Sequence, residues 1–321
     1  MSRIDALLLL MTLIWGTNYS VVKYAFAEID PQAFNALRMV IASAVFLCII
    51  VGLRPRGPAD RREAPPRTDA SAPFASIFHT PAPLTRSDWL SLAALGVVGH
   101  FLYQFFFIGG LAQTSVANSS LMLAATPVVI ALLSAALGHE RIGPLHWLGA
   151  GLSVLGIYIV IGQGLSLGSG TLRGDVFMLI SVGCWAAYTL GAGPLMRRHS
   201  PVGVTGLSMA IGTLLYVPAS SPRLLAVDWA SISLGTWAAL VYSALFALCI
   251  SYTIWYAAVR EIGSARTSVY SNLVPLVAML TAVVFLGEPL SGGKITGAAA
   301  VLLGVALTRV GRTAPAIPAE E

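Results

Sequence analysis

Charged residues are scarce in this chain. Asp, Glu, Lys and Arg make up 10% of its 321 residues, whereas 56% are hydrophobic and the mean hydropathy is +0.79. A soluble domain usually carries about 25% charged residues. The composition therefore excludes a water-soluble globular protein and predicts an integral membrane protein.

Cysteine and reactive clusters are also sparse. The three cysteines, Cys48, Cys184 and Cys249, lie in separate apolar runs, so neither a disulfide framework nor a metal site is predicted. Residues 292–294 (GGK) lack the upstream glycine and the following Ser or Thr of a phosphate-binding loop, and no nucleophile elbow is visible. We expect no cofactor, no metal and no catalytic residue, which leaves a membrane enzyme as the disfavoured alternative.

The chain repeats itself. One set of residues recurs 170 positions later, namely Asp5, Leu9, Trp15, Pro31, Leu37, Met39 and Ile41. A second set recurs 148 positions later, namely Trp89, Ala117, Ser120, Pro127, Glu140, Gly149 and Gly156. The shorter second spacing places an insertion in the first copy, within the polar stretch 54–86.

Ten apolar segments have about the length of 20 residues that a membrane span needs. They cover residues 6–26, 31–53, 87–111, 114–137, 143–162, 175–196, 201–216, 231–259, 264–286 and 290–310. Each copy holds five segments, an odd number, so the second copy must cross the bilayer in the opposite sense. The predicted fold is an all-α integral membrane protein with ten transmembrane helices, arranged as two inverted-topology five-helix repeats around a central cavity. Such repeats are typical of alternating-access transporters.

The distribution of basic residues predicts the orientation. Of 19 Lys and Arg residues, 14 fall on the side of both termini, four fall on the other side, and Arg38 lies within a span. This bias places both termini in the cytoplasm. The basic residues are spread over short connections, which argues against a nucleic-acid partner. The predicted parts are a first repeat over 1–53 and 87–162, a flexible cytoplasmic loop over 54–86, a second repeat over 173–311 and a tail over 312–321.

Polar and aromatic residues inside the spans are the candidate substrate site, because hydrocarbon penalises polar groups that have no partner. Residues at i, i+3, i+4 and i+7 share one helical face, and four spans carry such a face at repeat-related positions. The faces contain Trp15, Asn18 and Tyr19 in span one, His100, Tyr103, Gln104 and Phe107 in span three, Trp185 and Tyr188 in span six, and Ser251, Tyr252 and Trp255 in span eight. We predict that they line the central cavity. The alternatives are interfacial aromatic belts and plain helix packing.

Three further residues are predicted to act in gating or structure. Arg38 has three open roles, which are binding a substrate carboxylate, reaching the outer surface and anchoring carbonyls. Its neutral repeat partner, Ser208, favours a structural role. Pro127 and Pro275 lie at matching positions and are expected to bend their helices, either as hinges or as static kinks. His100 has two open roles: it either carries a proton or binds substrate, or it is a purely structural interior histidine.

Acidic residues are missing from the middle of every span, so a carboxylate proton relay has no site. Glu140 and Glu288, at matching ends of spans four and nine, are expected to cap helices or to pair with Arg141 and Lys294. Spans five and ten are rich in small residues, which predicts close helix packing in a scaffold or a homodimer contact.

With these features in place, the chain resembles the EamA-type members of the drug/metabolite transporter superfamily. The resemblance rests on residues 13–18 (LIWGTN), Arg38, residues 114–118 (TSVAN), Pro127, Glu140, residues 184–186 (CWA), Pro275 and residues 287–289 (GEP). It implies two inverted five-helix halves, peripheral spans five and ten, and a substrate path through a central cavity.

The ring-rich faces are most similar to those of bacterial exporters of aromatic amino acids. The resemblance therefore implies an inner-membrane exporter of aromatic or large neutral amino acids, with a small-molecule substrate and the lipid bilayer as partners. A broad drug or nucleotide-sugar carrier is the alternative within transport. A channel is distinguished from a carrier because its transport rate would not be stimulated by substrate on the opposite side of the membrane.

Overall fold

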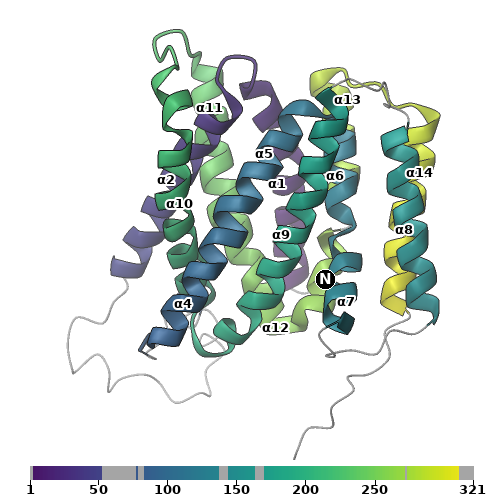
Figure 1. Ribbon diagram of the computed structural model, residues 1–321, viewed down its shortest axis with the longest axis horizontal. Coiled ribbons are helices and arrows are strands. Elements are labelled where there is room, and N and C mark those ends of the chain that lie inside the picture. Colours follow the sequence, from purple (N-terminus) through teal and green to yellow (C-terminus); the bar gives the residue numbers. More distant parts are fainter. Residues whose placement is uncertain are drawn as a thin grey trace, which may run out of the picture.

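The computed structural model describes residues 3–52, 77–78, 83–136, 144–162, 170–271 and 273–310, and within these ranges it is helical and holds no strand (Figure 1). Six helical segments are long and apolar enough to cross a membrane: Arg3–Ala25, Pro31–Gly52, Arg86–Gln113, Leu172–Met196, Pro201–Leu225 and Leu234–Glu261. Shorter apolar helices cover Val116–Ile130, Trp147–Ile159, Val274–Leu286 and Gly292–Leu307. The all-α prediction is confirmed, and the count of ten spans stays a prediction.

Polar caps and prolines begin the helices of the first half. Its elements are α1 (Arg3–Ala25), α2 (Pro31–Gly52), α4 (Arg86–Leu95), η1 (Gly96–Leu102), α5 (Tyr103–Gln113), α6 (Val116–Ala124), α7 (Thr126–Ala136) and α8 (Pro144–Gly162). Asp30 accepts hydrogen bonds from the first backbone N–H groups of α2, Thr85 and Asp88 form a capping box at α4, and Ser115 caps α6. These side chains satisfy N–H groups that have no partner within the helix.

The second half has a similar order of elements, except that one helix, α12, covers the positions that correspond to both α5 and α6. Its elements are α9 (Gly170–Arg198), α10 (Pro201–Leu225), α11 (Leu234–Tyr242), η2 (Ser243–Ile250), α12 (Ser251–Ser271), α13 (Val274–Leu286) and α14 (Gly292–Val310). Helix α10 continues past its predicted end at residue 216 and includes Pro218 and Pro222. Helix α12 continues to Ser271 through the predicted break at 260–263, where the sequence holds no proline to stop it.

Two π-helical segments, η1 and η2, lie at positions related by the spacing of 148. At the end of η1 the N–H of Tyr103 bonds the carbonyl of Val98, and at the end of η2 the N–H of Ser251 bonds that of Phe246. A π turn holds more residues than an α turn, so it rotates everything that follows it along the helix. Faces predicted from a constant 3.6-residue period therefore change within both segments.

Both spans predicted to bend at a proline are broken instead. Helix α6 ends at Ala124 and α7 begins at Thr126, while α12 ends at Ser271 and α13 begins at Val274. Pro127 and Pro275 are thus the second residues of new helices, where the missing N–H would have no partner within the helix in any case. The predicted bends are corrected to breaks at matching positions.

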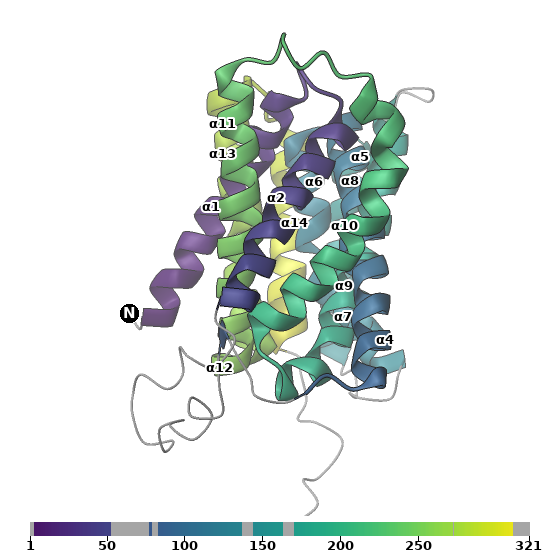
Figure 2. The ribbon, with the colours of Figure 1, turned by 90° about the vertical axis from the view of Figure 1, so that its left-hand side faces the viewer.

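Repeat partners pack against one another in two antiparallel pairs, α2 with α10 and α8 with α14 (Figures 1 and 2). Ser43 and Thr213, which are 170 positions apart, share a hydrogen bond of 2.8 Å. A methyl group at Gly156 would lie 2.8 Å from the carbonyl oxygen of Gly297, and one at Gly304 would lie 2.5 Å from that of Gly149. Residues 148 positions apart thus make reciprocal contacts across the α8–α14 pair.

The α8–α14 pair stands at one edge of the bundle (Figure 1). Its outer face is apolar and exposed, with Leu148, Val154, Tyr158 and Leu303 at 56% exposure or more. The predicted cytoplasmic loop over 54–86 and the tail over 312–321 lie almost wholly outside the described residues.

Candidate functional site

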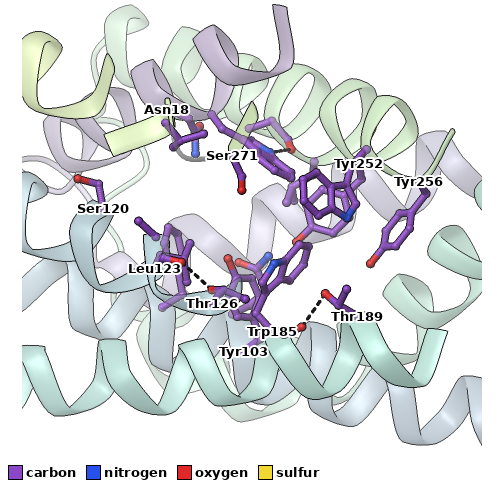
Figure 3. Close-up of a pocket in the computed structure, with 18 of the residues that line it drawn as sticks. Asn18, Tyr103, Ser120, Leu123, Thr126, Trp185, Thr189, Tyr252, Tyr256 and Ser271 are labelled. Carbon is purple, nitrogen blue, oxygen red and sulfur yellow. Dashed lines mark hydrogen bonds between the residues drawn. The ribbon is translucent and has the colours of Figure 1, made fainter. Parts of the chain in front are cut away.

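A cavity of about 290 Å³ lies in the middle of the bundle (Figure 3). Its walls come from α1, α2, α5, α6, α7, α9, η2, α12 and α13. The volume is at the lower end of the range of about 300–1,000 Å³ for small-molecule sites. The cavity therefore suits one small organic molecule.

Five aromatic rings from four helical segments dominate its wall. Trp185 of α9 lies 5.1 Å from Tyr103, 5.4 Å from Tyr252 and 6.2 Å from Trp15, measured between ring centroids. Trp255 lies 5.6 Å from Trp15. These distances are those of favourable ring pairs, so the rings hold one another in place.

A second aromatic group extends the wall toward the end of α1. Phe107 stacks on Tyr103 at 5.6 Å and meets Tyr19 edge-on at 5.5 Å. All three rings are buried and line the cavity. The two groups share Tyr103 and together form a continuous aromatic surface.

Polar atoms interrupt this surface. The Asn18 side-chain oxygen, the Tyr19 hydroxyl and the Trp255 Nε1 are buried and have no hydrogen-bond partner among the described residues. Buried polar groups normally have a partner, so these three atoms leave hydrogen-bonding capacity unused on residues that line the cavity. The Trp15 Nε1 is occupied, because it donates to the carbonyl oxygen of Ala247 in η2 at 3.0 Å.

Arg38 supplies the charge of the cavity wall. It is 1% exposed, and it donates from Nη1 to the Ser243 hydroxyl at 2.9 Å and from Nη2 to the Gln104 side-chain oxygen at 2.6 Å. It therefore joins α2 to α5 and to η2. No lining residue in the described part of the chain carries a carboxylate.

Three of the predicted site residues lie outside the lining. The His100 ring contacts Tyr188, with 3.2 Å between the His100 Nε2 and the Tyr188 hydroxyl. The same hydroxyl lies 3.4 Å from the Ser208 hydroxyl. Ser251 is fully buried directly after η2. His100 and Ser251 therefore do not lie on the cavity face on which a constant helical period places them.

The other predicted site residues surround the cavity: Trp15, Asn18, Tyr19, Tyr103, Gln104, Phe107, Trp185, Tyr252 and Trp255, with Arg38 and Pro275. The sequence reasoning missed the walls that the broken spans provide. Thr126 and its repeat partner Val274 both line the cavity, as do Leu123 and its partner Ser271. The paired prolines were the signal for them.

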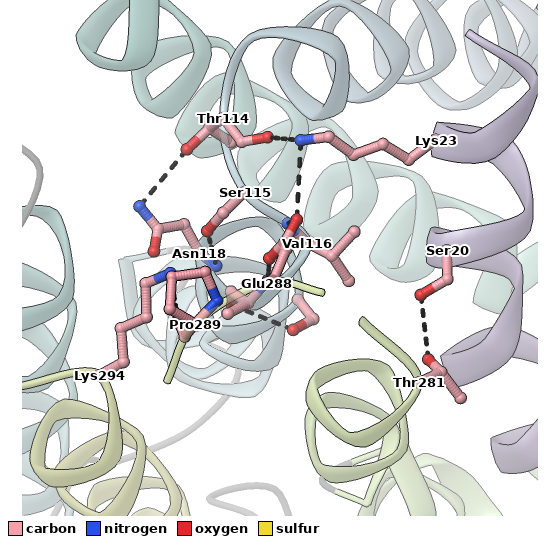
Figure 4. A network of polar contacts seen from close by, with 12 residues as sticks. Ser20, Lys23, Thr114, Ser115, Val116, Asn118, Thr281, Glu288, Pro289 and Lys294 are labelled. Carbon is pink, nitrogen blue, oxygen red and sulfur yellow. Dashed lines mark hydrogen bonds and ion pairs between the residues drawn. The ribbon is translucent and has the colours of Figure 1, made fainter. Parts of the chain in front are cut away.

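A polar network joins α1, α6 and the connection between α13 and α14 (Figure 4). The Glu288 carboxylate accepts hydrogen bonds from the N–H groups of Val116 at 2.9 Å and Ala117 at 3.4 Å, at the start of α6. Lys23 lies 3.9 Å from Glu288 and donates to the carbonyl oxygen of Thr114. Glu288 thus joins the α13–α14 connection to α1 and α6.

Neighbouring hydrogen bonds extend this polar network. The Thr114 hydroxyl donates to Asp175 at 2.6 Å, which ties in α9. Of the two roles expected for Glu288, the structure shows helix capping, at the start of α6. It does not show the pairing with Lys294, which donates instead to the carbonyl oxygen of Pro289 at 3.3 Å. Glu140 and Arg141 lie outside the described residues.

Residues of α9 and α12 line the other end of the cavity. Met196, two residues before the end of α9, and Val259 of α12 both line it. The end of α9 and helix α12 lie toward the end of the bundle that carries the N-terminus (Figure 2). The cavity lining therefore extends toward that end of the molecule.

Comparison with known proteins relates the whole chain to transporters. A model of the EamA-like transporter family matches residues 2–65, 70–162 and 172–310. An uncharacterized transporter of Bacillus subtilis, YyaM, is 26% identical over 306 residues, which are 94% of this chain and 92% of the relative. A Salmonella typhimurium protein named "Probable amino-acid metabolite efflux pump" is 26% identical over 326 residues, with 98% and 99% of the two chains covered.

One solved structure, described only as a crystal structure of a protein, has the same fold. Its TM-score is 0.62 at 19% sequence identity, and the match covers 96% of this chain and 98% of that chain.

Proposed function

The chain belongs to the EamA-like transporter family, and from this premise we propose that it exports aromatic or large neutral amino acids by alternating access. As a member of that family it is a multi-pass membrane protein that moves a small molecule. The proposal adds the substrate, the direction and the mechanism.

The observation that carries the substrate is the ring cluster. Trp15, Tyr103, Trp185, Tyr252 and Trp255 converge on one cavity from different helical segments. Rings arranged in this way favour a flat apolar side chain that stacks between them. The Salmonella relative, named as an amino-acid metabolite efflux pump, supports the same class.

The charges of the cavity lining argue against carriers of cationic drugs and of nucleotide sugars. A site for cationic drugs would need a carboxylate, and none lies in the described lining. A sugar-phosphate site would need several cations for its phosphates, whereas Arg38 is the one formal charge of the described lining.

The mechanism follows from the paired halves. The reciprocal antiparallel contacts of α2 with α10 and of α8 with α14 support an inverted repeat. Two similar halves that rock about a central site expose it to each side in turn. In our proposal the structure is the state open toward the cytoplasm, with both termini in the cytoplasm, and the Glu288 network closes the outer end of the inner-membrane protein.

Counterflow into liposomes tests the substrate. Purified protein is reconstituted with unlabelled phenylalanine, glucose or a cationic dye inside, and uptake of the same labelled compound is followed. We expect accumulation of phenylalanine alone. Trp185→Ala should abolish it, while Trp237→Ala, at an exposed ring outside the cavity, should leave it intact. If no amino acid exchanges, the assignment of amino acids as the substrate is wrong.

A further inference from the structure

Arg38 brings one positive charge into the cavity wall without a counter-ion. Its hydrogen-bond partners, the Ser243 hydroxyl and the Gln104 amide oxygen, are both neutral. No ion pair involves Arg38 in the part of the chain that the structure describes. The charge lies seven residues into α2 and is almost completely buried.

Such a charge is costly. A buried ion without a partner of opposite sign loses its hydration and regains little of it from neutral dipoles. Ionisable groups inside membrane spans are therefore rare, and they mark substrate pathways. An anionic ligand group would supply the missing counter-charge at Arg38.

The guanidinium has donors left for such a group. It carries five N–H bonds, and two of them are used by Ser243 and Gln104. The Nε atom is buried and has no hydrogen-bond partner among the described residues. A guanidinium binds a carboxylate with two parallel N–H bonds, and Nε with a neighbouring Nη forms one such pair.

The cavity treats an amino group differently. With no carboxylate in the described lining, an ammonium group meets only neutral acceptors, such as the free oxygen of Asn18, and ring faces. The acid end of an amino acid is thus recognised by a full opposite charge, and its amine end is not. Next to Arg38, an additional positive charge on the ligand is repelled.

We propose that Arg38 determines specificity by binding the substrate carboxylate, and that the α-amino group is dispensable. The substrate class is then the aromatic monocarboxylates, of which aromatic amino acids are one kind. This inference rests on the proposed function in one respect, that the cavity is the transport site.

Three ligands that share a phenylethyl group and differ in their end group test it. Binding of 3-phenylpropionate (anionic), 3-phenylpropionamide (neutral) and phenethylamine (cationic) to the purified protein is measured by quenching of tryptophan fluorescence. We expect the acid to bind about 10- to 100-fold more tightly than the amide, as for a hydrogen-bonded charge, and the amine to bind most weakly. Equal binding of acid and amide, or tighter binding of the amine, would overturn the proposal.

Substitutions separate recognition from structure. Arg38→Gln should bring the acid down to the affinity of the amide, and Arg38→Lys should restore part of the difference. Arg173→Gln, at an arginine that lies over Phe177 outside the cavity, should leave the ranking unchanged. If Arg38→Gln weakens acid and amide by the same factor, the residue is only structural and the proposal fails. These assays need no transport, so they stand apart from the counterflow test.

Discussion

Replacing Glu288 by Gln should open the closed end of the molecule. The carboxylate accepts two N–H groups at the start of α6 and lies 3.9 Å from Lys23. Glutamine keeps one oxygen acceptor but loses the second acceptor and the charge. In the proposed cycle these contacts exist only while the outer end is closed, so their loss favours the outward-open state.

The size of the shift follows from three contributions. A hydrogen bond to a charged group contributes about 1.5–3 kcal/mol, of which the amide retains part. The partly buried ion pair of Lys23 and Glu288 adds about 0.2–1 kcal/mol, and a negative charge at a helix N-terminus adds about 0.3–1 kcal/mol. A loss of about 1–2 kcal/mol changes the ratio of the two states about 5- to 30-fold.

Cysteine labelling measures that ratio. Ser120 lines the cavity four residues after Val116 and is 1% exposed. In a background without Cys48, Cys184 and Cys249, a Ser120→Cys variant is treated from outside with a membrane-impermeant maleimide. The rate should rise about 5- to 30-fold when Glu288→Gln is added, in line with the shift in population.

A matched control removes a neighbouring charge. The Lys294 side chain donates to the Pro289 carbonyl and makes no hydrogen bond to Glu288 among the described contacts, so Lys294→Gln should change the labelling rate far less than Glu288→Gln does. Labelling that is equally slow with and without the Glu288→Gln substitution, or that rises equally with Lys294→Gln, would refute the role of Glu288 in closure.

Three further predictions concern packing and pH. Gly99→Ala places a methyl group 2.1 Å from the Tyr188 ring, which should lower the free energy of unfolding by about 1–3 kcal/mol and reduce transport, as thermal unfolding and counterflow would reveal. Trp15→Phe keeps a ring but loses the 3.0 Å bond to η2, so unfolding should cost about 0.5–1.5 kcal/mol less; an unchanged melting temperature would contradict this. The carboxylate of Glu28 accepts the N–H of Ser233 at 2.9 Å, which holds the pKa of Glu28 below its usual range. Its stabilisation is present above the ordinary carboxyl pKa and is lost as the pH falls through the lowered value, so Glu28→Gln should lower the melting temperature at pH 7, with a difference that disappears in acid.

Much of the helical arrangement could be predicted from the sequence, because prolines and small polar residues are favoured at the first positions of helices. Pro31 and Pro201, at repeat-related positions, begin α2 and α10 as expected. The helix breaks before Pro127 and Pro275 were foreseen only as bends. A proline disfavours the helical conformation of the preceding residue without determining whether the chain bends or stops.

The π segments were beyond sequence reasoning. The sequences GVVGHFL and SALFALCI are ordinary apolar helix sequences, and the extra residue per turn is decided by tertiary packing. His100, which was expected on the cavity face, lies against Tyr188 and outside the cavity lining. Likewise, Lys23 as the partner of Glu288 depends on a contact between distant spans, which no local pattern encodes.

Trans-stimulation tests the central claim most directly, that one central cavity is exposed to the two sides of the membrane in turn. Liposomes containing the protein are loaded with labelled phenylalanine, and its exit is timed with and without unlabelled phenylalanine outside. We expect the outside substrate to accelerate the exit, and Trp185→Ala to abolish the acceleration. Rapid exit that is indifferent to the outside substrate would contradict the account and indicate a channel.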